Sequence, residues 1–153
     1  MSTIPQGFTT VTPHLVVSPC KKALEFYQQA FGAVVRNQMT MPNSDVIMHA
    51  EMQIGNAVIM LADAFPDYGV VGPDALGGSP VTIHLYVDDV DAAMKRAEGA
   101  GAKVTFPVAD QFWGDRYGKL KDPFGHHWSI ATHLRDPSPE EIRAAAEAMF
   151  GNS

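Results

Sequence analysis

Pro13-His14-Leu15-Val16-Val17 and Ile83-His84-Leu85-Tyr86-Val87 are the stretches that decide the fold, because the second repeats the pattern of the first 70 positions later. Each is an extended, mostly apolar segment followed by a helical pattern that ends near glycine. A chain that matches itself at a fixed spacing contains a duplicated structural unit. We therefore predict two copies of one unit, in which His14 is equivalent to His84.

Each copy predicts the order strand, helix and three strands. In the first copy, Ser18 is a suitable N-cap with Pro19 at the first helical position, and apolar residues then recur on one helical face. In the second copy the cap falls on Asp88 or Asp89. Turn signals for a hairpin follow in both copies, at Gly55-Asn56 and at Asp122-Pro123-Phe124-Gly125.

The 153 residues are expected to form a single α+β domain of two βαβββ modules with an extra C-terminal helix. Module one covers about residues 8–63 and module two about residues 81–135. Residues 64–80 are rich in Gly and Pro and predict a linker or a flap over a site. A capping box at Ser138-Pro139-Glu140-Glu141 predicts the last helix, over residues 138–150.

Composition restricts the class of protein. The formal net charge of -6, with scattered Lys and Arg, disfavours nucleic acid as a partner. The longest apolar run in the predicted strands, Ala57 to Ala62, is too short to cross a membrane, and Met1 to Phe8 has neither the basic nor the apolar part of a secretory signal. The single cysteine, Cys20, excludes an intrachain disulfide, so the expected location is the cytoplasm.

Alternation along the predicted strands places polar residues on one face of each sheet. His14 shares a face with Thr12 and Val16, His84 shares one with Thr82 and Tyr86, and His49, Glu51 and Gln53 form a third polar row. If the modules enclose one cavity, His14, His84 and Glu51 form a set that suits a divalent metal such as zinc, iron or manganese. The alternative is that the histidines bond to neighbouring side chains and that Glu51 is solvated.

The segment Phe112-Trp113-Gly114-Asp115-Arg116-Tyr117 combines large aromatic residues with adjacent charges and a glycine. Such a loop can hold a flat ligand at the mouth of a cavity, which makes Trp113 and Arg116 candidate pocket residues. Ordinary surface packing is the alternative for this segment.

The chain resembles the PhnB-like branch of the vicinal oxygen chelate superfamily, which includes glyoxalase I, extradiol dioxygenases, fosfomycin-modifying enzymes and bleomycin-binding proteins. The resemblance spans about residues 8–135 and rests on Thr12-Pro13-His14-Leu15, Ala23-Leu24-Glu25-Phe26-Tyr27, Met48-His49-Ala50-Glu51 and Asp122-Pro123-Phe124-Gly125-His126, with the 112–118 segment. It implies paired βαβββ modules around a cup-shaped cavity, frequently in homodimers. The positions of the superfamily's metal ligands fall on Thr12, Met60 or Ile59, Thr82 and Ser129, none of which is a good metal ligand.

Three hypotheses follow. The first is a glyoxalase-like or bleomycin-resistance-like protein, with no assigned cofactor or activity, that binds a small molecule in a pocket lined by His14, His49, Glu51, His84, Tyr86, Trp113 and Arg116. The second is a metal-dependent lyase, isomerase or dioxygenase in which His14 and His84 hold the cation. The third is a non-catalytic structural or partner-binding domain, since one fold can support all three.

Overall fold

The computed structural model describes residues 1–151 and contains the predicted duplication. Module one consists of β1 (His14–Val16), α1 (Cys20–Phe31), β2 (Val34–Thr40), β3 (Ile47–Ile54) and β4 (Ala57–Ala62). Module two consists of β5 (Thr82–Tyr86), α3 (Val90–Ala100), β6 (Lys103–Asp110), β7 (Asp115–Lys121) and β8 (His127–His133). The predicted order of strand, helix and three strands is confirmed in both modules.

Each module forms one four-stranded mixed sheet, with the strand orders β1-β4-β3-β2 and β5-β8-β7-β6. In both sheets the first strand runs parallel to the last strand of its module, and the other neighbours are antiparallel. The register places His14 beside Met60 and His84 beside Ser129. The two histidines therefore occupy equivalent places in equivalent sheets.

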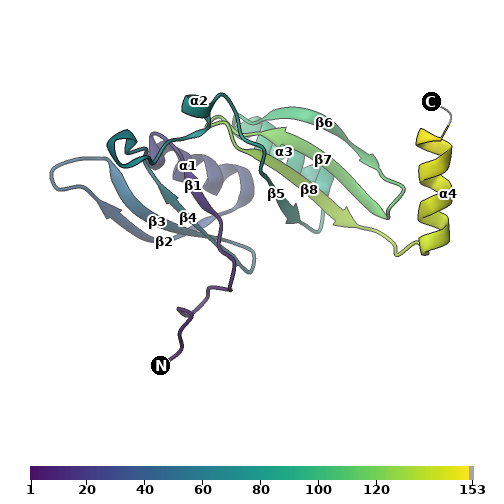
Figure 1. Ribbon diagram of the computed structural model, residues 1–153, viewed down its shortest axis with the longest axis horizontal. Helices are drawn as coiled ribbons and strands as arrows, with labels where there is room; N and C mark the ends of the chain where they lie inside the picture. The colour runs from purple at the N-terminus through teal and green to yellow at the C-terminus, as the bar shows by residue number, and fades with distance from the viewer. Residues whose placement is uncertain (152–153) are drawn as a thin grey trace.

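The two sheets lie side by side, and α1 and α3 contact each other where the modules meet (Figure 1). Each helix covers one face of its own sheet, because its apolar stripe packs on the inward-facing strand residues. Residues of both modules contribute to one core. Trp128 of β8 is fully buried, with its ring centroid 4.6 Å from that of Phe31 and 5.5 Å from that of Tyr27, both in α1.

The buried carboxylate of Asp122 joins the modules. One oxygen accepts hydrogen bonds from Tyr27 Oη at 2.5 Å and Trp128 Nε1 at 2.8 Å, and the other accepts from the backbone N–H groups of Phe124 and His126. Burial and the nearby carboxylate raise the pKa of Tyr27 well above its usual value, so its hydroxyl remains a donor. The contact fixes α1 of module one on the β7–β8 turn of module two.

The start of α1 corrects one sequence prediction. Ser18 does not cap the helix, which begins at Cys20, and Ser18 Oγ instead accepts a hydrogen bond from Ala64 N at 2.9 Å. The buried carboxylate of Asp63 takes the capping role by accepting from Cys20 N at 3.0 Å. A charged acceptor bonds an N-terminal helix amide more strongly than a neutral hydroxyl, which explains the exchange. Of the two caps predicted for α3, Asp88 and Asp89, Asp89 is the one that forms, because its Oδ1 accepts from Ala92 N.

The segment between the modules is not without structure. It contains a 3₁₀ turn, η1 (Pro66–Tyr68), and a short helix, α2 (Pro73–Leu76). Both end at a glycine with positive φ, as glycine-rich connections do.

The predicted C-terminal helix is present as α4 (Pro139–Phe150), with Ser138 Oγ accepting from Glu141 N at 3.1 Å. It stands past the outer end of the β5–β8 sheet (Figure 1). Every residue of α4 is described, and none of them is buried. Within residues 1–151, no helix is long and apolar enough to cross a membrane.

Candidate functional site

Module two carries a run of aromatic rings on the sheet face that α3 leaves uncovered. The register places Tyr86, Ala131 and Tyr117 in one row across three strands, and side chains in such a row point the same way. The next row holds His84 and Ser129. Because Ala131 and Ser129 are small, the rings of His84 and Tyr117 stack over them, 5.9 Å apart and 24° from parallel.

Further rings extend this run. Tyr117 lies 5.5 Å from Trp113 and 6.0 Å from Phe106, and His84 lies 4.6 Å from Tyr86, all measured between ring centroids. We call the set the aromatic face: His84, Tyr86, Phe106, Trp113 and Tyr117. Tyr86 is 68% exposed, Phe106 43% and Trp113 37%. Large rings in mutual contact and open to solvent are typical of a surface that binds a ligand or another protein.

His84 gives the aromatic face a polar group. Its Nδ1 lies 2.6 Å from Ser129 Oγ, and burial holds the pKa of the imidazole below its ordinary value, partly offset by Asp115. The neutral ring is therefore favoured at neutral pH. It keeps one ring nitrogen for a hydrogen bond to a ligand.

Module one has a different uncovered face. His14, Met60, Glu51 and Asn37 form one row across its four strands, and Met39 and His49 form the next. We call these six residues the first open face. His49 Nε2 lies 2.9 Å from Glu51 Oε2, and the rings of His14 and His49 meet edge to face at 6.3 Å.

A groove of about 610 Å³ runs between β1 and β5. Its volume is within the range of small-molecule sites. The lining residues are Val11, Pro13, His14, Leu15, Ser79, Val81, Thr82, Ile83, His84 and His126. His126 Nε2 also lies 2.9 Å from the carbonyl oxygen of Val16 and so connects the two sides of the groove.

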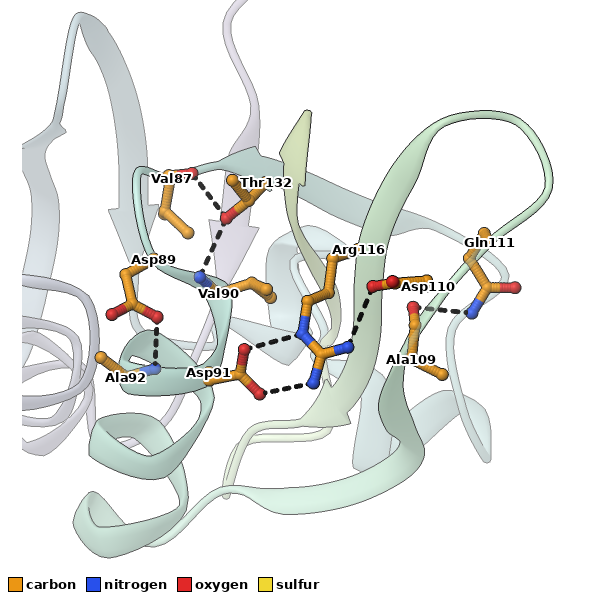
Figure 2. Close-up of polar contacts among 10 residues, drawn as sticks. All are labelled: Val87, Asp89, Val90, Asp91, Ala92, Ala109, Asp110, Gln111, Arg116 and Thr132. Carbon is orange, nitrogen blue, oxygen red and sulfur yellow. Dashed lines mark hydrogen bonds and ion pairs between the residues drawn. The ribbon is translucent and has the colours of Figure 1, made fainter. Parts of the chain in front are cut away.

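The structure thus brings His14 and His84 to one groove, places Tyr86 and Trp113 on the aromatic face, and places His49 and Glu51 on the first open face. Arg116 lies elsewhere. Figure 2 shows its guanidinium between Asp91 and Asp110, with Nε 2.7 Å and Nη2 3.0 Å from the Asp91 carboxylate and Nη1 3.0 Å from Asp110. These bonds raise the pKa of Arg116 and lower that of Asp91. Since Arg116 alternates with Tyr117 along β7, it faces α3 and not the aromatic rings.

The side chains predicted to hold a metal, His14, His84 and Glu51, do not form a cluster within a single chain. Among residues 1–151, no three His, Cys, Asp or Glu side chains form a cluster that could hold a metal ion. Glu51 is paired with His49, and His84 Nδ1 with Ser129. The register also places the closing-strand positions Met60 and Ser129 beside His14 and His84, while Thr82 pairs with His127. Within residues 1–151 of a single chain, these side chains therefore do not form a complete metal centre.

A second polar cluster, centred on Asp115, is not predicted from the sequence. Asp115 is 5% exposed and accepts hydrogen bonds from Trp113 Nε1 at 3.2 Å and from His133 Nδ1 at 2.7 Å. His133 Nε2 lies 2.7 Å from Asp136, and the two carboxylates raise the pKa of His133. Sequence patterns do not identify Tyr117 as a site residue either, because they predict one loop over residues 112–117, whereas β7 begins at Asp115. Alternation along a strand that begins at Asp115 places Tyr117 on the same sheet face as Asp115.

Paired βαβββ modules with an open groove between them define a class of proteins. Similarities in sequence and in structure to known proteins place the chain in that class. The chain belongs to the Glyoxalase/Bleomycin resistance protein/Dioxygenase superfamily, whose sequence signature matches residues 8–130. Members of this superfamily often bind divalent metals.

Several proteins are similar to this chain in sequence or in structure. An uncharacterized protein of Mycobacterium bovis is 46% identical over 142 residues, covering 91% of this chain and 93% of its own length. Protein PA1353 from Pseudomonas aeruginosa, of known crystal structure, is 26% identical with a TM-score of 0.67, covering 83% of this chain and 99% of its own. TioX from Micromonospora is 25% identical with a TM-score of 0.63, covering 82% and 99%. A PhnB protein from Bacillus cereus, at 13% identity and a TM-score of 0.64 over 81% of this chain and 99% of its own, shares the fold.

Proposed function

We propose that the protein binds a flat small molecule against the aromatic face, in a hollow that two copies of the chain close together. The observation that carries the proposal is the run of five contacting rings, from the exposed Phe106 and Trp113 through the half-buried Tyr117 to the exposed His84 and Tyr86. Aromatic rings prefer offset stacking or edge-to-face contacts, so a planar ligand suits this surface. The cytoplasm is the proposed location, as the sequence predicts.

The polar groups beside the rings restrict the ligand further. The neutral His84 offers a single hydrogen bond rather than a charge, and half of the residues that line the groove next to it are apolar. A planar compound with a hydrogen-bonding group at one edge and no strong charge there fits this environment. Such a pocket needs few polar contacts for orientation.

The proposed homodimer rests on exposed surface. A compact monomer of 153 residues exposes about 7,600 Å², whereas this chain exposes 9516 Å². The difference of about 1,900 Å² exceeds the ~800 Å² that each partner buries in an ordinary interface. A twofold axis that lays the first open face of one copy over the aromatic face of the other would cover both faces and enclose two identical hollows.

Ligand binding is tested with a panel of planar heteroaromatic compounds. Trp128 is fully buried and Trp113 is exposed, so a stacked ligand should quench the fluorescence of Trp113 alone. A ligand at about 100 times its Kd should add about 2.7 kcal/mol of stability in a thermal shift.

Tyr86→Leu should weaken the binding of any hit roughly 2- to 12-fold, because it removes one ring contact. Tyr68→Leu is the matched control, since Tyr68 is also an exposed tyrosine (85%, against 68% for Tyr86) but lies in the segment between the modules. A panel without any hit, or equal affinities for the two variants, would sink the proposal. The first outcome would favour a structural or partner-binding domain.

A metal-dependent lyase, isomerase or dioxygenase is the second candidate, because His14 and His84 line the same groove. Metal analysis of protein purified without chelator distinguishes this metal-dependent enzyme from a metal-free binding protein. Stoichiometric metal that is lost in His14→Ala and His84→Ala would favour the enzyme over a metal-free binding protein.

A further inference from the structure

Helix α4 has an apolar stripe that the rest of residues 1–151 leaves exposed or half-buried. Ile142, Ala145, Ala146 and Met149 recur at helical spacing, and each is exposed or only half-buried, with Met149 61% exposed. An isolated helix of 12 residues is marginal in water, and helices gain most of their stability by packing an amphipathic face. A surface beyond the described residues would supply the packing that such a helix needs.

The segment that leads into α4, here called its root, is hydrogen-bonded to the β6–β7 end of module two. The carbonyl oxygen of Gly114 accepts from Leu134 N at 2.9 Å and from Arg135 N at 3.2 Å. A Cβ on Gly114 would clash with the carbonyl oxygen of Arg135, so the two segments approach as closely as glycine permits. His133 adds a bridge between Asp115 of β7 and Asp136. The helix therefore leaves the domain from a defined place, beside the β6–β7 hairpin end.

We propose that the stripe on α4 docks on the β2–β3 hairpin end of a second copy of this chain. This rests on the twofold dimer of the proposed function. The β2–β3 and β6–β7 hairpins are equivalent in the two modules and lie at opposite ends of the molecule (Figure 1). When module one of one copy lies over module two of the other, the two hairpin ends come together. Helix α4 then starts next to the partner's β2–β3 end.

The receiving surface has matching chemistry. The β2–β3 hairpin end exposes Met39 (49%), Met41 (37%), Val46 (39%) and Met48 (39%). Met41 N donates to Val46 O at 2.8 Å, so the end is an ordered hairpin. Flexible thioethers adapt to an incoming apolar helix such as one that presents Ile142 and Met149. The excess of about 1,900 Å² over a compact monomer leaves enough surface for both the sheet faces and α4, given the ~800 Å² per partner of an ordinary interface.

The test compares two glutamates on neighbouring positions of α4 in the full chain. Ala145→Glu places a charge on the stripe, and Ala144→Glu places the same charge on the opposite side of the helix. Neither residue is buried, so both variants should keep the near-ultraviolet circular dichroism of the parent. Sedimentation equilibrium should give a dimer Kd raised at least about tenfold for Ala145→Glu and unchanged for Ala144→Glu, since one decade corresponds to the loss of a single good apolar contact. Met41→Glu should weaken the dimer as Ala145→Glu does.

The outcomes separate this inference from the proposed function. If the parent dimerises and Ala145→Glu and Ala144→Glu dimerise equally well, α4 does not dock on the second copy, while ligand binding sensitive to Tyr86→Leu still stands. If the parent is a monomer at micromolar concentration, both the docking of α4 and the shared hollow are wrong. If only Met41→Glu fails to weaken the dimer, the stripe docks elsewhere and the inference is overturned.

Discussion

Replacing Asp122 with alanine should be among the most damaging single changes outside the aromatic core. The substitution leaves Tyr27 Oη and Trp128 Nε1 without their acceptor, and both residues are fully buried. Each orphaned buried donor costs about 1–3 kcal/mol, so we expect a loss of about 2–6 kcal/mol before the two backbone N–H groups are counted. At about 2–4 °C of Tm per kcal/mol for a domain of this size, the midpoint should fall by roughly 10 °C.

The assay is urea and thermal unfolding at neutral pH, with Asp67→Ala as the control. Asp67 is an exposed carboxylate in η1, so its removal should change stability by less than about 0.5 kcal/mol. Tyr27→Phe removes one donor alone, and its effect should not add to that of Asp122→Ala, with a coupling of about 0.5–3 kcal/mol in the double variant. Equal stability of Asp122→Ala and Asp67→Ala, or strict additivity with Tyr27→Phe, would refute the claim that this carboxylate joins the modules.

Two further predictions concern the root of α4. Gly114→Ala should destabilise the fold by about 2–4 kcal/mol, because strained backbone and a clash with the Arg135 carbonyl act together, whereas Gly69→Ala, with positive φ but open space around it, should cost about 1 kcal/mol in the same urea titration. The two carboxylates raise the pKa of His133 above 6.5, so its stabilising contribution is complete below that pH and is lost as the pH rises through the higher folded value. The stability advantage of the parent over His133→Asn should therefore shrink as the pH rises above 6.5, and an advantage that grows would contradict the two-carboxylate bridge.

Sequence patterns predict the local structure of this chain well, because their signals are local. The 70-residue repeat gives the order of elements, and alternation correctly separates exposed His84 and Tyr86 from half-buried Leu85 on β5. The cap at Asp89 is predicted because acceptor and amide are three positions apart. At Ser18 the same reasoning fails, because the true acceptor, Asp63, lies 43 positions away from the amide that it binds.

The candidate site is harder to predict for the same reason. Alternation places His14 and Glu51 among polar rows, but it does not show that Glu51 is paired with His49 or that the two sheets lie side by side. The side-by-side arrangement depends on contacts such as Tyr27 with Asp122, which are 95 positions apart. Arg116 is predicted as a pocket residue from its neighbours in sequence, whereas its partners Asp91 and Asp110 are brought to it by the tertiary structure.

The duplicated modules differ mainly on one side of each strand. Most positions that face α1 or α3 are apolar in both halves, with Arg116 as an exception, whereas the opposite positions carry thioether, imidazole and carboxylate groups in one half and mainly aromatic rings in the other. Alternation along the strands thus separates the positions where substitution would destabilise the fold from the positions that tolerate substitution. A laboratory library restricted to the outward positions of one half could therefore change ligand preference while the scaffold and the other half stay intact.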